Sequence, residues 1–170
     1  MISKVDQRKH DYYLSVAESL AECQLVEFEL RFYIMNALEL ETKKVSAPMP
    51  FKMTAIELKR TRKGYKLAAL GKLTEYFSKL SDNPPLVAAL NIFRKERNLL
   101  AHAALAVCLD PDGELDYGMV EKLSGRVIAA KAEAKRITDA IHETGMRLVV
   151  HLYFDPIKDS LDAKKPVASA

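Results

Sequence analysis

The sequence predicts an all-α fold, a four- to five-helix up-and-down bundle with two long helices. Apolar residues recur every three or four positions over two long segments, one near each end of the 170-residue chain. Shorter segments with the same period lie between them, separated by proline-containing stretches that end helices. A chain of this length forms one domain, which we place at residues 1–156, followed by a flexible tail at 157–170.

The first long helix is predicted over residues 6–40, which contain no glycine or proline. It carries two apolar stripes on nearly opposite sides, and we expect one to face the core and the other to face a second copy of the chain. Residues 26–32 also alternate between apolar and charged side chains, so a strand is the rival interpretation there. The first stripe is Cys23, Val26, Leu30, Tyr33, Ile34 and Ala37, and the second stripe is Leu14, Ala21, Leu25, Phe28, Phe32 and Met35.

Shorter helices are predicted in the middle of the chain. Two prolines end the first long helix, and residues 52–60 form a short helix that Thr54 caps. Residues 67–80 resume helical spacing, and Asp82 or Asn83 then caps a helix whose first turn accommodates a proline. The apolar side of the 67–80 segment consists of Leu70, Leu73, Phe77 and Leu80.

The second long helix is predicted over residues 119–154. Its apolar residues follow alternating steps of three and four, which is typical of a coiled-coil seam, and Thr144 is the one weak position. A turn signal at residues 110–114 precedes it, and the flanks of that turn are expected to pair as a short β-hairpin near 107–117. The seam consists of Val120, Leu123, Val127, Ala130, Ala134, Ile137, Ile141 and Leu148.

Composition narrows the class of protein. The chain is 49% hydrophobic and 29% charged, and no apolar run approaches the roughly 20 residues that span a bilayer, so we expect no membrane partner. The polar N-terminus lacks a signal peptide, which predicts a cytoplasmic protein. A net charge of +3 is compatible with a polyanionic partner. Cys23 and Cys108 are too few for a disulfide scaffold or a zinc motif, and we expect no metal or cofactor.

The residues most suggestive of chemistry are Arg97, Asn98 and His102, within the helix that follows the proline turn. A fixed guanidinium and an imidazole that exchanges protons near neutral pH are what phosphodiester cleavage requires. Asn98 and His102 are four apart and share a helix face, whereas Arg97 and His102 lie roughly 140° apart. A paired copy of this helix, or unwinding near Ala101, is needed to aim both groups at one phosphate.

Two further features could support such a site. Glu27 falls inside the first stripe, so it either reaches solvent at the edge of the stripe or pairs with Arg97 or His102. Glu96 is a second candidate for a supporting carboxylate. The basic segment, residues 59–66, is either a phosphate-tracking patch for RNA or a solvated connector. Its cations are Lys59, Arg60, Arg62, Lys63 and Lys66.

The order of helices and the motif Arg97-Asn98-Leu99-Leu100-Ala101-His102 resemble the HEPN superfamily. That resemblance implies an all-helical, often dimeric protein that cleaves RNA without a metal, in a toxin or phage-defence setting. His102 would shuttle a proton, Arg97 would stabilise charge on the phosphoryl oxygens, and Asn98 would orient the histidine or the phosphate. The implied partners are RNA, a second copy of the chain and a cognate antitoxin or regulatory protein.

The alternative is a non-catalytic helical dimer that acts as an RNA- or nucleotide-binding or protein-interaction module. In that case Arg97, Asn98 and His102 form an internal polar network that fixes helix register, or they line a binding cleft.

Overall fold

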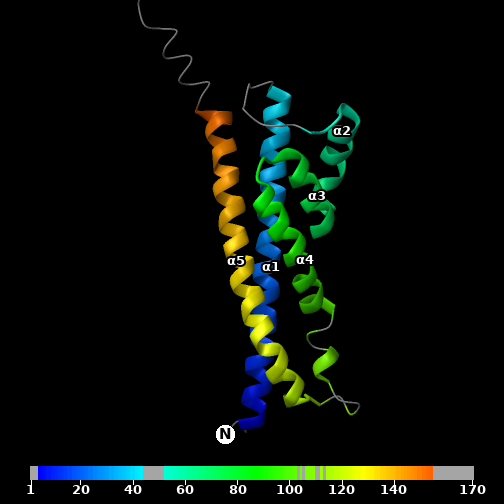
Figure 1. Ribbon diagram of the computed structural model, residues 1–170, viewed down its shortest axis with the longest axis vertical. Coiled ribbons are helices and arrows are strands. Elements are labelled where there is room, and N and C mark those ends of the chain that lie inside the picture. The colour runs from blue at the N-terminus through cyan, green and yellow to red at the C-terminus, as the bar shows by residue number, and fades with distance from the viewer. Residues whose placement is uncertain are drawn as a thin grey trace, which may run out of the picture.

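The computed structural model describes residues 4–43, 52–102, 104, 106–109, 112 and 114–154. These residues form an all-α bundle with two long helices, as the sequence predicts (Figure 1). The helices are α1 (Lys4–Lys43), α2 (Ala55–Gly64), α3 (Leu70–Leu80), α4 (Pro84–His102) and α5 (Tyr117–Tyr153), and two short 3₁₀ helices are η1 (Tyr65–Leu67) and η2 (Ala106–Cys108).

The two long helices α1 and α5 lie side by side and run in the same direction (Figure 1). Side-chain contacts across them rise together in residue number: Lys131 Nζ lies 2.7 Å from Glu18 Oε2, and His142 Nδ1 lies 3.3 Å from Glu29 Oε2. Parallel neighbours cannot be joined by a short turn, so α2, α3 and α4 fill the connection and alternate in direction. The predicted up-and-down order is therefore present, and α4 runs antiparallel to both long helices.

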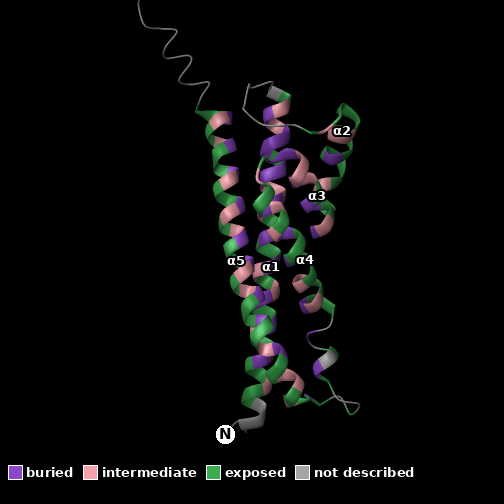
Figure 2. Cartoon of the chain, in the orientation of Figure 1, coloured by how far each residue is buried: buried purple, intermediate pink, exposed green. Residues whose placement is uncertain are grey.

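The core lies between α1 and α5, with α3 and α4 covering it. Figure 2 shows buried residues on the faces that these helices turn toward each other. All six residues of the first stripe are buried, so the helical interpretation of residues 26–32 is confirmed and the strand interpretation is wrong. On α5 the predicted seam residues are buried, except that Val120 is half-buried. Gly145, beside the weak position Thr144, and Leu152, one turn beyond Leu148, are buried as well.

The second stripe faces away from this core. Leu14, Leu25, Phe28 and Met35 are 40–60% exposed, and Phe32 is half-buried. These residues leave an apolar strip exposed along the outer side of α1. The first stripe therefore faces the core of the single chain, as predicted. The second stripe is not covered within the single chain and remains available to a partner.

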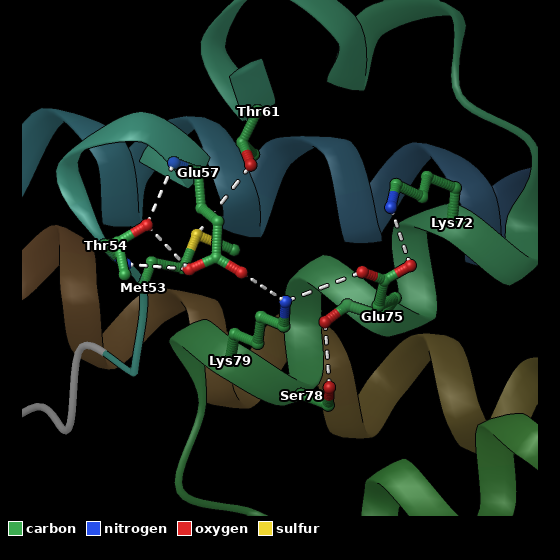
Figure 3. A network of polar contacts seen from close by, with 8 residues as sticks. All are labelled: Met53, Thr54, Glu57, Thr61, Lys72, Glu75, Ser78 and Lys79. Carbon is green, nitrogen blue, oxygen red and sulfur yellow. Dashed lines mark hydrogen bonds and ion pairs between the residues drawn. The ribbon is translucent and has the colours of Figure 1, made fainter. Parts of the chain in front are cut away.

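Polar contacts hold α2 against α3 (Figure 3). Thr54 caps α2 as predicted: its hydroxyl accepts from the Glu57 backbone N–H, and its own N–H donates to Glu57 Oε2 at 2.8 Å. The other carboxylate oxygen of Glu57 accepts from Lys79 Nζ at 2.7 Å. The Lys79 ammonium, followed by the Thr54 bonds, lowers the pKa of Glu57 to about 2.

The second predicted cap is Asn83, whose side chain accepts from the Leu86 backbone N–H at 3.1 Å.

The expected β-hairpin reduces to one antiparallel bridge between Leu109 and Leu115, supported by a 2.7 Å bond from the Asp116 N–H to the Cys108 carbonyl. The described part of this segment contains no strand, and its first flank forms η2 instead.

The predicted tail and the two prolines after α1 lie outside the described residues. Among the helices described, none combines the length and the apolar character needed to cross a bilayer.

Candidate functional site

Arg97 occupies a core-facing position of α4. The buried residues of this helix include Leu90, Phe93 and Leu100, and Arg97 follows Phe93 by four positions on the same face. Its side chain is 29% exposed, and Nη2 donates to Glu27 Oε1 at 2.9 Å. Of the two interpretations of Glu27, pairing with Arg97 is therefore the one observed. The pair joins α1 to α4 at the edge of the core.

Arg31 holds the other oxygen of the same carboxylate. Its Nη2 lies 3.1 Å from Glu27 Oε2, and the Glu27 side chain is only 13% exposed. One carboxylate is thus held between two guanidiniums, and we call Glu27, Arg31 and Arg97 the two-arginine cluster. Sequence reasoning missed Arg31, although a glutamate four residues before an arginine is the favoured order for an ion pair on one helix.

Arg31 also connects this cluster to the basic segment. Its Nε donates to the Lys66 carbonyl at 3.1 Å, and its Nη2 donates to the Ala68 carbonyl at 3.0 Å. These carbonyls belong to the connection between α2 and α3, at the C-terminal end of the basic segment. The cluster therefore lies at the end of the basic segment, so the exposed cations of that segment and the two arginines are close together.

Most cations of the basic segment point into solvent. Arg62 is exposed as well, but its Nη2 donates to Glu41 Oε2 at 2.6 Å and to the Leu38 carbonyl at 3.2 Å, which ties α2 to the end of α1. The remaining predicted cations are exposed: Lys59, Arg60, Lys63 and Lys66.

Asn98 and His102 do not join Arg97 in the single chain. Both are exposed, and no hydrogen bond to either side chain is found in the described part of the protein. The α4 helix continues through His102 without unwinding at Ala101, so His102 lies roughly 140° around the helix axis from Arg97. A single chain therefore places Arg97 at the seam with α1 and His102 on the outer surface of α4.

Glu96 lies on the other flank of α4, away from the two-arginine cluster. Both of its carboxylate oxygens accept from Arg126 Nη2 of α5, at 3.0 Å each. Adjacent residues on a helix are 100° apart, and this step turns Glu96 toward α5 while Arg97 faces α1. Glu96 thus fixes α4 against α5 and does not contact the residues that it was predicted to support.

Cys23 lies one helical turn before Glu27 and is buried. Burial raises the pKa of its thiol to about 11, and the nearby Arg97 charge opposes that shift. A thiol with such a high pKa is almost entirely protonated at neutral pH, so Cys23 is not a nucleophile here.

Two surface cavities lie away from the motif. One, of about 590 Å³, lies between the beginning of α1 and the first turns of α5, and the other, of about 360 Å³, lies between the α3–α4 turn and α5. Arg97, Asn98 and His102 line neither of them. In the described residues, no group of three or more His, Cys, Asp and Glu side chains is arranged to hold a metal ion.

The second stripe borders the two-arginine cluster on α1. Arg31 is three residues from Phe28, a separation of about 60° around the helix axis, and it is adjacent in sequence to Phe32. The order of features around this side of the bundle is therefore the second stripe, the two-arginine cluster, and then the α4 surface that carries Asn98 and His102. A partner seated on the second stripe would lie beside the cluster.

Comparisons of this chain with protein-family models, with curated proteins and with solved structures find no match. The class that the structure itself defines is an all-α bundle with one carboxylate held between two arginines beside an exposed apolar helix face.

Proposed function

We propose that the chain is a metal-independent endoribonuclease of HEPN type that cuts RNA in a cleft at a homodimer interface. The observation that carries this proposal is the position of Arg97. Its partly exposed side chain lies at the seam between α1 and α4, with the apolar second stripe on one side and the exposed Asn98 and His102 on the other.

A second copy of the chain supplies what one chain lacks. The second stripe runs from Leu14 to Met35, 22 residues of α1 and about 30 Å at 1.5 Å per residue, and is long enough for a helix-to-helix interface. A two-fold axis across this stripe would place the two-arginine clusters of both chains along the edges of one interface. The Arg97 of one chain and the His102 of the other would then face a shared groove, which removes the 140° separation.

The reaction in that groove is transesterification. The ribose 2′-hydroxyl attacks the adjacent phosphorus and the 5′-oxygen leaves, so the products carry a cyclic phosphate and a 5′-hydroxyl. His102 transfers a proton, a contribution of typically ~10²–10⁴ in rate. Arg97 stabilises the charge that builds on the phosphoryl oxygens, and Asn98 orients the phosphate or the imidazole. Glu27 acts through Arg97 by fixing the direction of its guanidinium.

A second candidate function is favoured by the same ion pair. Glu27 already balances the charge of Arg97 and joins α1 to α4, which is what a purely structural network would do. The protein would then be a non-catalytic helical dimer that binds RNA, a nucleotide or another protein.

The test is incubation of purified protein with RNA in EDTA, beside the variants Arg97→Ala and His102→Ala. We expect the parent to release fragments with cyclic phosphate ends and both variants to lose this activity while keeping the mass of the parent. Lys95→Ala is the matched control, because it removes an exposed cation from the same helix. Cleavage that persists in either variant, or a parent that cuts no RNA, would contradict the nuclease proposal.

Melting temperatures measured on the same samples separate loss of activity from loss of folding. His102 is exposed, so His102→Ala should leave the melting temperature unchanged whichever function is correct. Arg97→Ala should lower it, since the largely buried Glu27 loses a partner. A loss of stability in Arg97→Ala together with an inactive parent supports the non-catalytic module.

A further inference from the structure

The two-arginine cluster has the form of an occupied anion site. Glu27 presents one negative charge through two oxygens, and each oxygen contacts a different guanidinium, Arg97 at 2.9 Å and Arg31 at 3.1 Å. An RNA phosphodiester presents the same pattern, one negative charge shared by two non-bridging oxygens. Arginine pairs bind both kinds of anion through parallel N–H···O bonds.

We propose that Arg31 and Arg97 together bind the RNA backbone phosphate, and that Glu27 is an internal carboxylate that the phosphate displaces. This inference rests on the proposed function, because it assigns RNA as the ligand of that same site. It adds Arg31 as a phosphate-binding residue outside the Arg-Asn-x-x-x-His motif.

Both arginines can be reached from solvent. The side chain of Arg31 is 30% exposed and that of Arg97 is 29% exposed, whereas the Glu27 side chain between them is 13% exposed. A guanidinium has five N–H donors, and the ion pair with Glu27 uses Nη2 of Arg97. An incoming phosphate can therefore bind donors that the ion pair leaves unused before Glu27 moves away.

The position of Arg31 is fixed independently of Glu27. Its bonds to the Lys66 and Ala68 carbonyls hold the guanidinium in place when the carboxylate moves away. The same bonds place it where the exposed Lys63 and Lys66 can attract a polyanion toward the cluster. An RNA strand that follows the basic segment would meet Arg31 first, then Arg97.

If RNA displaces Glu27, the substitution Glu27→Gln should lower the stability of the fold and at the same time strengthen RNA binding. Without the carboxylate, the two guanidiniums repel each other, so the folded state loses stability. The same change removes the internal competitor, so RNA binds more tightly. A residue with a purely structural role would give weaker or unchanged RNA binding when the fold is destabilised.

The experiment measures binding of a fully 2′-O-methylated oligoribonucleotide, which lacks the attacking hydroxyl, by fluorescence anisotropy over a series of salt concentrations. Glu27→Gln should bind about three- to tenfold more tightly than the parent and melt at a lower temperature. Arg31→Ala should weaken binding and reduce the salt-dependence slope by about 0.7, the value for one lost phosphate contact on a single strand. Arg31→Lys retains the charge and should keep most of that slope.

Glu29→Gln is the matched control. It removes one negative charge from the same helix, but Glu29 lies beside His142 on the α5 side. The inference is overturned if Glu27→Gln binds no tighter than Glu29→Gln, if Arg31→Ala leaves the slope unchanged, or if the parent does not bind the oligonucleotide. Because the probe cannot be cut, a protein that shows the predicted binding without cleaving natural RNA would defeat the nuclease proposal and leave the phosphate site standing.

Discussion

Replacing Phe28 by glutamate tests whether the second stripe is a dimer interface. Phe28 is 60% exposed and lies near the middle of that stripe. A phenylalanine side chain contributes roughly 200 Å² of surface, so about 120 Å² remains for a partner to cover. At about 25 cal/mol per Å² this amounts to about 3 kcal/mol per chain, and a two-fold interface loses it twice. Phe28→Glu should therefore raise the dimer dissociation constant by at least about a hundredfold.

The assay is sedimentation velocity at low micromolar concentration, with circular dichroism to confirm that the helices remain folded. Ile92→Glu is the control, since Ile92 is an even more exposed apolar residue, at 68%, on the flank of α4 that faces α5. We expect the parent and Ile92→Glu to sediment as dimers and Phe28→Glu to sediment as a monomer. A monomeric parent would refute the reasoning, as would a Phe28→Glu protein that still dimerises.

Three predictions concern the fold and the thiol. Lys79→Met should lower the free energy of unfolding above about pH 4.5, the ordinary pKa of a glutamate carboxyl. The difference from the parent should vanish as the pH falls toward about 2, because the lowered pKa of Glu57 stabilises the fold only while that carboxylate is ionised. Urea denaturation at a series of pH values measures this difference. Ile137 is fully buried in the α1–α5 seam, so Ile137→Ala should lower the free energy of unfolding by about 2–5 kcal/mol in the same assay at neutral pH. Lys135 is exposed, so Lys135→Ala should change this free energy little. Cys23 should react with a thiol reagent at pH 8 far more slowly in the native protein than in urea, since burial raises its pKa to about 11, and equal rates would contradict its burial.

The helices and their caps could be predicted because they depend on residues close in sequence. Arg97 lies four residues after the buried Phe93, so the helical period alone is enough to put it on the core-facing side of α4. The need of Glu27 for a partner followed from its place in an apolar stripe. Thr54 and Asn83 act as caps because their side chains reach backbone N–H groups three residues later.

The remaining features depend on how helices meet, and one sequence does not contain that information. Arg31 is held by two backbone carbonyls that are 35 and 37 residues away, and backbone acceptors leave no pattern in the side chains. Glu96 was grouped with Arg97 because the two are neighbours in sequence, yet the 100° step between them turns Glu96 toward Arg126 on α5. The parallel pairing of α1 and α5 likewise follows from packing and not from periodicity.

The continuity of α4 through His102 gives the strongest constraint on any catalytic mechanism. Since the helix does not unwind, Arg97 and His102 can meet only if they come from different chains. Arg97→Ala and His102→Ala should therefore complement each other when coexpressed. Half of the dimers in an equal mixture are mixed, and each retains one of its two Arg97–His102 pairs, so about a quarter of the parent activity should return. If each site used both residues of a single chain, the mixture would be as inactive as either variant alone, and the shared groove would have to be abandoned.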